Sequence, residues 1–133
     1  MNNQYKKNFW DWHEIKNAIH HTSKKQVYFY EREIWFCSLG VNVGHEQDGG
    51  SKTFKRPVLV LKKFNKETFW GIPITSKNKI DKYHFQFQYK NRRYSLILSQ
   101  VRLLDSKRLI KKINSLSKKE FDQIKEQFVK ILQ

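Results

Sequence analysis

The sequence predicts an α+β fold that is mainly β: a small curled sheet or barrel with a helix near each end. Several short runs of strand-forming residues follow one another closely between positions 26 and 104. Segments with apolar residues at helical spacing flank these runs. No stretch rich in Pro, Gly or Ser divides the 133 residues, so we expect one domain over 1–133. It comprises a helical extension over 1–30 and the barrel over 31–133.

The first expected element is an amphipathic helix over 8–24. Asn8 can cap its start, and Trp12 and Ile19 fall at helical spacing. Trp10 and Trp12 are interpreted as core or interface anchors, because large aromatic side chains bury much apolar area.

Strand-forming residues then alternate with turns and one long loop. We expect strands over 26–39, 58–62, 68–75, 82–90 and from 94 towards 104. Segment 40–54 holds four of the five glycines and is predicted to be a long loop, which in a compact domain is usually functional. Cys37 lies on the first strand and is interpreted as structural, since no local pattern supplies a partner that would activate its thiol.

Two helices are expected after the strands. Asp105 or Ser106 can cap a short helix that runs through Ile113. Ser117 and Glu120 have the spacing of a capping box at the start of the last helix. The apolar stripe of that helix is formed by Phe121, Ile124, Phe128 and Ile131.

Composition restricts the partners and the chemistry. The 27 Lys and Arg outnumber the 12 Asp and Glu, and the net charge of +15 favours a polyanion such as nucleic acid. A solvated basic surface is the alternative. No apolar run is long enough to span a membrane and no signal-peptide pattern opens the chain, so we expect a cytoplasmic protein without a membrane partner. A single cysteine and the absence of ligand spacing predict no metal site and no cofactor.

Three segments carry polar groups that could act on a phosphate. Arg56 precedes Pro57, which forces it into an extended conformation where loop meets strand. Thr75 and Ser76 close another strand, and a further polar segment covers 99–102. From the residues alone, Arg56 can equally be an exposed strand opener, and the hydroxyls can simply start a turn.

Taken together, however, five segments resemble the MazF/PemK family of type II toxin-antitoxin ribonucleases, in the same order along the chain. They are EIWFCSLG (33–40), VGHEQDG (43–49), RPVLV (56–60), ITS (74–76) and LSQVRLLDSKRL (98–109). The resemblance covers about residues 33–132 and implies an SH3-like curled barrel whose first loop lies over an RNA groove. It implies that Arg56 and Thr75 are the catalytic pair of an endoribonuclease.

The implied reaction is cleavage of single-stranded RNA without a metal. The ribose 2′-hydroxyl attacks the adjacent phosphorus and leaves a cyclic phosphate and a 5′-hydroxyl. Two positions depart from the family pattern: His45 stands where Ser is common, and Ser99 stands where Asp or Glu is common. Proton transfer is therefore left open between Glu46 and His45. The RNA-binding residues that the resemblance implies are Gln47, Lys55, Ser76, Lys77, Ser99 and Gln100.

The resemblance also implies partners. We expect a homodimer, inhibition by a cognate acidic antitoxin, and operator DNA as a ligand bound together with that antitoxin. The alternative is a non-catalytic barrel that binds nucleic acid or antitoxin, because one fold can host many functions. The N-terminal extension could either brace the barrel or alter access to the groove.

Overall fold

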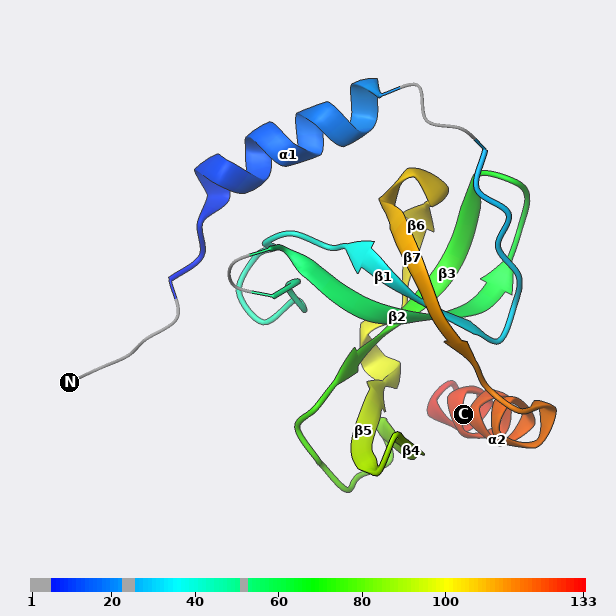
Figure 1. The fold of residues 1–133 in the computed structure, drawn as a ribbon. Helices are drawn as coiled ribbons and strands as arrows, with labels where there is room; N and C mark the ends of the chain where they lie inside the picture. Colours follow the sequence, from blue (N-terminus) through cyan, green and yellow to red (C-terminus); the bar gives the residue numbers. More distant parts are fainter. Residues whose placement is uncertain (1–5, 23–25, 51–52) are drawn as a thin grey trace.

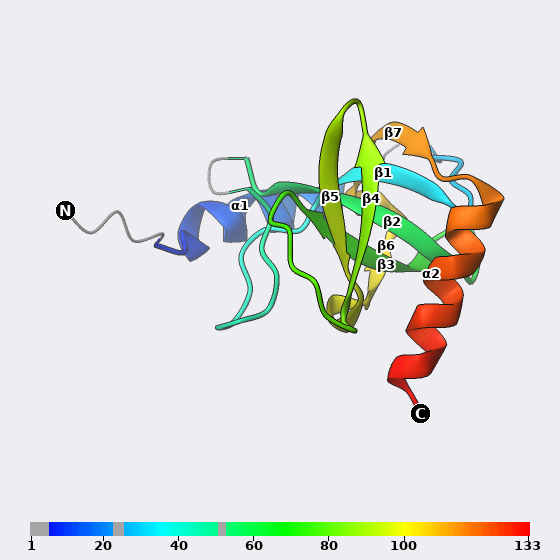
Figure 2. The same ribbon diagram turned by 90° about the horizontal axis from the view of Figure 1, so that it is seen from below.

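The computed structural model describes residues 6–22, 26–50 and 53–133, which form two α-helices and a curled antiparallel sheet (Figures 1 and 2). The elements are α1 (Phe9–His21), β1 (Glu33–Ser38), β2 (Lys55–Lys63), β3 (Thr68–Thr75), β4 (His84–Tyr89), β5 (Arg92–Ile97), η1 (Leu98–Gln100), β6 (Arg102–Asp105), η2 (Ser106–Arg108), β7 (Leu109–Ser115) and α2 (Lys118–Ile131). The mainly β, curled sheet with a helix at each end is as predicted.

The sheet has seven strands in the order β4-β5-β3-β2-β1-β7, with β6 paired to β3. Strand β3 is shared between two halves of the sheet. Its first part pairs with β2 and β6, whereas Ile74 and Thr75 at its end pair with β5. The β4–β5 hairpin therefore stands away from the rest, as Figure 2 shows. The end of β3 lies at the junction of the two halves.

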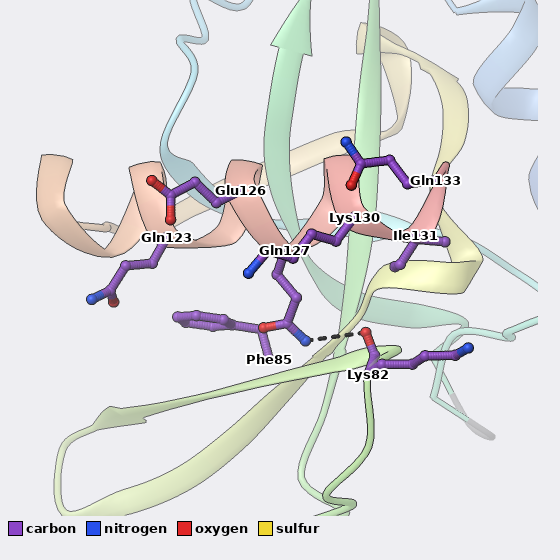
Figure 3. Close-up of a pocket in the computed structure, with 8 residues that line it drawn as sticks. All are labelled: Lys82, Phe85, Gln123, Glu126, Gln127, Lys130, Ile131 and Gln133. Carbon is purple, nitrogen blue, oxygen red and sulfur yellow. Dashed lines mark hydrogen bonds between the residues drawn. The ribbon is translucent and has the colours of Figure 1, made fainter.

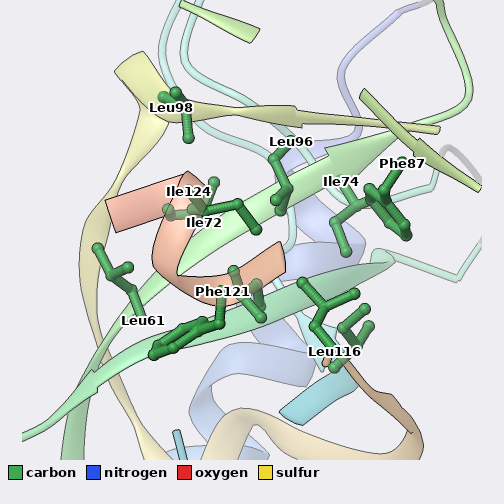
Figure 4. Packing of buried hydrophobic residues seen from close by; sticks show 11 residues of the cluster. Leu61, Ile72, Ile74, Phe87, Leu96, Leu98, Leu116, Phe121 and Ile124 are labelled. Atoms are coloured by element: carbon green, nitrogen blue, oxygen red, sulfur yellow. The ribbon is translucent and has the colours of Figure 1, made fainter. Parts of the chain in front are cut away.

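Two hydrophobic clusters fill the two sides of β2. Leu59 and Leu61 join a cluster that includes α2 and the β4–β5 hairpin (Figure 4), whereas Val58 and Val60 join a cluster around Phe69. Successive residues of a strand point to opposite faces, so burial on both sides explains the unbroken apolar run of this strand.

The helix termini follow the predicted caps. The Asn8 side chain accepts a hydrogen bond from Asp11 N at 3.1 Å, and Ser117 Oγ accepts one from Glu120 N at 3.1 Å. Both satisfy amides that lack partners within the helix. The start of α2 is further fixed by Phe121, which packs in the same cluster as the Leu116 side chain.

At its C-terminal half, α2 packs beside the start of β4. Gln127 Nε2 donates to the carbonyl oxygen of Lys82 at 3.1 Å (Figure 3) and to that of His84 at 3.0 Å. A hollow of about 360 Å³ lies there. It contains none of the predicted site residues and is a gap between two packed elements.

The sequence-based prediction of a strand from residue 26 is wrong for 26–32. This segment is irregular, and β1 begins only at Glu33. Phe29 is nevertheless fully buried and packs against Phe69, with the two rings tilted and their centroids 5.1 Å apart. The backbone of Arg32 takes a positive φ of 79°, which turns the chain just before β1. Burial without strand pairing produced the misleading apolar pattern.

The predicted short helix through Ile113 is also wrong. Asp105 does cap a turn, because its carboxylate accepts a hydrogen bond from Lys107 N at 2.8 Å, but only Ser106–Arg108 is helical. The chain then continues as β7, which pairs with β1. Strand pairing outweighed the capping signal here.

Smaller differences concern β5 and the first helix. Strand β5 ends at Ile97 instead of running on towards Leu104, because the short helix η1 interrupts it. Trp12 is buried, as predicted for an anchor, whereas Trp10 is 84% exposed and is no core residue. Cys37 is fully buried, and burial raises the pKa of its thiol far above the usual range, so the interpretation of Cys37 as structural is confirmed.

Candidate active site

Arg56 and Thr75 lie side by side at the ends of two neighbouring strands. The antiparallel pairing of β2 and β3 begins at Val58 and Pro73, so the start of β2, with Arg56, lies near the end of β3, with Thr75. Arg56 Nη1 donates to the carbonyl oxygen of Ile74 at 3.1 Å, which fixes the guanidinium beside Thr75.

The loop between β1 and β2 holds Arg56 from the other side. Arg56 Nε donates to the backbone oxygen of Asp48 at 2.5 Å. The guanidinium is thus bound by two carbonyls from two different segments while its side chain stays half-buried. Burial and fixed acceptors restrict its rotamers, as expected for a group that must meet a phosphate in one orientation.

Asp48 organises the loop. Its carboxylate is almost fully buried and accepts a hydrogen bond from Asn42 N at 2.6 Å. The next residue, Gly49, donates to the carbonyl of Gly40 at 2.7 Å, and a Cβ on Gly49 would lie 2.0 Å from the Phe54 carbonyl oxygen. Only glycine permits this approach. Asp48 and Gly49 therefore hold the middle of the loop against its first residues, Gly40 and Asn42.

A cleft of about 260 Å³ lies between this loop and the segment after β5. It is lined by Asn42, Glu46, Gln47, Ser99, Gln100, Val101 and Arg102. Gln100 joins its two walls, since Gln100 Oε1 accepts from Gln47 N and Gln100 Nε2 donates to the His45 carbonyl, both at 3.2 Å. The structure thus brings together four of the predicted residues, Glu46, Gln47, Ser99 and Gln100.

The two candidates for proton transfer occupy different positions. Glu46 lines the cleft, and its carboxylate accepts a hydrogen bond from Val43 N at 2.9 Å, closing the turn over 43–46. His45, which is exposed like Glu46, does not line the cleft and meets Gln100 only through its backbone carbonyl. Geometry therefore distinguishes two residues that the sequence left equivalent.

The remaining predicted residues lie at the two strand ends. Lys77 N donates to Thr75 Oγ1 at 3.2 Å, so the hydroxyl accepts one bond and can still donate its own proton. Ser76 and Lys77 are exposed beyond the end of β3. Lys55 is exposed at the start of β2, where alternation turns it to the face opposite Arg56.

Sequence reasoning missed three residues around the site. Arg102 lines the cleft. The pKa of Arg108 is lowered mainly because Arg108 is buried, and further by the positive charge of Arg102. Asp48 belongs to the segment VGHEQDG (43–49), but no role of its own was predicted for it from the sequence. Lys7 lies outside the recognised segments, yet its ammonium forms an ion pair with Asp48 at 3.3 Å. The only early signal was an acid placed beside two glycines.

Neither a metal centre nor a membrane segment was found in the parts of the chain that the structure describes. Within residues 6–22, 26–50 and 53–133, no three His, Cys, Asp or Glu side chains gather where they could hold an ion. None of the described helices is long and apolar enough to span a bilayer.

Known proteins share both the sequence pattern and the fold. A family model described as PemK-like, MazF-like toxin of type II toxin-antitoxin system matches residues 30–132. A search of curated proteins gave no significant match.

Three solved structures resemble the chain at low identity. MazF from Deinococcus radiodurans superposes with a TM-score of 0.62 and 17% identity, covering 80% of this chain and 98% of that one. The Mycobacterium tuberculosis toxin MazF-mt6 gives 0.59 and 15%, covering 76% and 96%. A mycobacterial endoribonuclease solved with its cognate antitoxin gives 0.58 and 10%, covering 79% and 95%. These likenesses show a shared fold, and the family model, which matches most of the chain, shows that it belongs to the PemK-like, MazF-like toxins of type II toxin-antitoxin systems.

Proposed function

We propose that this chain is an endoribonuclease toxin that cleaves single-stranded RNA through attack of a ribose 2′-hydroxyl on the adjacent phosphorus. The observation that carries the proposal is the bond from the Arg56 guanidinium to the Ile74 carbonyl, which holds the arginine at the end of β3, next to Thr75. A bond forms between the 2′-oxygen and phosphorus while the bond to the 5′-oxygen breaks. The products are a 2′,3′-cyclic phosphate and a 5′-hydroxyl.

Arg56 stabilises the charge that builds up on the non-bridging phosphate oxygens. Its guanidinium is held by the carbonyls of Asp48 and Ile74, so little reorganisation is needed as the phosphorane forms. An ordinary arginine has a pKa too high to serve as an efficient base, which leaves it an electrostatic role. Thr75 donates a hydrogen bond from its hydroxyl to one of the same oxygens.

We assign proton removal from the 2′-hydroxyl to Glu46 in preference to His45. Both residues are exposed, but Glu46 lines the cleft with a carboxylate anchored by Val43 N, whereas His45 is not among the residues that line it. The proton passes to the carboxylate, and the departing 5′-oxygen takes a proton from water or from the protonated base. No step requires a metal ion.

The partners follow from the family. The mycobacterial relative was solved with its cognate antitoxin, and an acidic antitoxin of this chain would complement its charge of +15. A homodimer, and binding of operator DNA together with the antitoxin, complete the proposal.

The proposal is tested by incubating the purified protein with a long unstructured RNA in excess chelator. Arg56→Ala and Thr75→Val should each lower cleavage by about 100-fold or more, as loss of a transition-state donor does elsewhere. Thr68→Val is the matched control, since Thr68 lies at the far end of the same strand, and it should cleave like the wild type. Fragment ends should carry 5′-hydroxyls.

The outcomes separate the candidate functions. Cleavage that stops in chelator contradicts the metal-free mechanism. Tight RNA binding without cleavage across varied sequences supports the second candidate, a non-catalytic binding barrel. One observation favours that candidate: Ser99 lines the cleft where family members commonly carry an acid, so no carboxylate projects from this wall.

A further inference from the structure

The N-terminal segment that precedes the family match is tied to the active-site loop. The matched region begins at residue 30, so Lys7 and α1 lie outside it. Figure 1 shows α1 running along one side of the sheet next to the β1–β2 loop. The contacts between them reach the residues that hold Arg56.

Lys7 makes the first connection. Its ammonium donates to the carbonyl oxygens of Asn42 and Gly44, the latter at 2.8 Å, and forms an ion pair with the Asp48 carboxylate at 3.3 Å. The two charged side chains are 21% and 9% exposed. One cation thus binds three points of the turn that spans 42–48, in a partly desolvated setting where charge pairs act more strongly than at the surface.

Asp48 passes this restraint to the catalytic arginine. Its carboxylate is fixed by Lys7 and by Asn42 N, while its backbone oxygen accepts from Arg56 Nε. A shift of Asp48 therefore moves the acceptor that orients the guanidinium. The path from Lys7 to Arg56 contains only one intermediate residue.

Trp12 provides the second connection. Its indole is 5% exposed, packs with Val41 and Phe54, and lies where a Cβ on Gly40 would come within 1.9 Å. These contacts hold both ends of the loop against α1. Lys107 Nζ fastens the C-terminal end of the helix by donating to the His20 carbonyl at 2.9 Å.

We propose that Lys7 is a positioning residue for Arg56, and that the N-terminal segment is a brace which sets the β1–β2 loop in its active geometry. This inference rests on the proposed function. A brace of this kind acts on the rate of the chemical step, because misplacing a catalytic group by about 1 Å can cost as much as 100-fold. It leaves RNA affinity largely unchanged.

The test uses Lys7→Met, which keeps the length of the side chain and removes its charge. We expect kcat for cleavage of a long single-stranded RNA to fall roughly 10- to 100-fold with KM nearly constant. RNA with 2′-O-methyl groups lacks the nucleophile and so reports binding alone. Its Kd should change by no more than about twofold, because the restraint acts on the chemical step. Lys7→Arg should restore most of kcat. Lys125→Met, the same change on α2, is the control and should behave as wild type.

A second measurement follows the loop itself. The amides of Asn42, Glu46 and Gly49 are hydrogen-bonded within the loop, so Lys7→Met should speed their hydrogen exchange while amides of β2 and β3 stay protected. If Asp48 is the intermediate, Lys7→Met should add little to the defect of Asp48→Asn.

The outcomes are distinct from those that test the proposed function. A wild type that cleaves no RNA contradicts that function, and loop exchange then still decides whether Lys7 restrains the loop. A wild type that cleaves, together with a Lys7→Met variant of equal kcat, overturns the positioning role whatever the exchange rates. A loss confined to RNA affinity overturns it as well.

Discussion

A single glycine, Gly40, sets how closely α1 can approach the barrel. Its backbone has a positive φ of 71°, and the indole of Trp12 occupies the space where a side chain would begin. Conformation and packing therefore both require glycine at this position. The brace described above depends on this contact.

Gly40→Ala should consequently destabilise the protein by about 2–4 kcal/mol, from the strained φ and the overlap with Trp12. Urea denaturation followed by circular dichroism measures the change. Gly44→Ala is the matched control: Gly44 also has a positive φ, 55°, but its missing Cβ faces open space. That variant should lose only about 1–2 kcal/mol, the backbone cost alone. Equal losses in both variants would contradict the packing of Trp12 on Gly40.

The Cys37 thiol should be unreactive towards alkylating reagents in the folded protein. Burial raises the pKa of its thiol, so the reactive thiolate is scarce at any pH near neutrality. A maleimide or iodoacetamide at pH 8 should label the thiol only after denaturant is added, as mass spectrometry can show. Rapid labelling of the native protein would mean that β1 opens readily.

At the scale of elements, the clearest local signal is the start of α2. Ser117 accepts a hydrogen bond from Glu120 N, so Ser117→Ala should cost about 1 kcal/mol of unfolding free energy. Ser115→Ala, at the exposed end of β7, is the control and should change stability little. Thermal denaturation of both variants checks this, and a loss common to both would argue against the cap.

Elements defined by local chemistry could be predicted from the sequence, whereas those decided by distant partners could not. The caps at Asn8 and Ser117 depend on neighbours three residues away, and both are present. Segment 109–113 has a capping signal before it, but pairing with β1 makes it a strand. Segment 26–32 buries Phe29 without joining the sheet.

The residues of the candidate site likewise fall into those that the sequence predicted and those that only the structure revealed. Arg56 and Thr75 were identified through segments that resemble a family, and the Arg56 bond to the Ile74 carbonyl sets the guanidinium next to Thr75. Asp48 contributes through its backbone carbonyl, which accepts from Arg56. Lys7 contributes through its contact with the Asp48 carboxylate, 41 positions away in the sequence. No periodicity or spacing encodes such contacts, because they depend on how the β1–β2 loop and the segment before α1 pack on the finished barrel.

At the scale of the whole molecule, the net charge of +15 should govern how RNA binding responds to salt. Each phosphate contacted by Lys or Arg on a single strand contributes a slope of about −0.7 in a plot of log affinity against log salt. If about four phosphates are contacted, the affinity for 2′-O-methyl RNA should fall on the order of 50-fold between 50 and 200 mM salt. Fluorescence anisotropy measures it. An affinity that did not depend on salt would mean that the protein binds RNA through its bases and not through its phosphates.

The position of β7 at one end of the sheet order has a consequence for solubility at high concentration. An outer strand offers backbone groups to which a strand of another molecule can add. Strand β7 carries two consecutive exposed lysines, Lys111 and Lys112, whose side chains project to opposite faces. The Lys112 ammonium is paired with the Glu33 carboxylate at 3.0 Å, so an edge-to-edge contact would chiefly bring the Lys111 charges of the two molecules together. We expect this repulsion to disfavour open-ended growth into fibres through the outer strand.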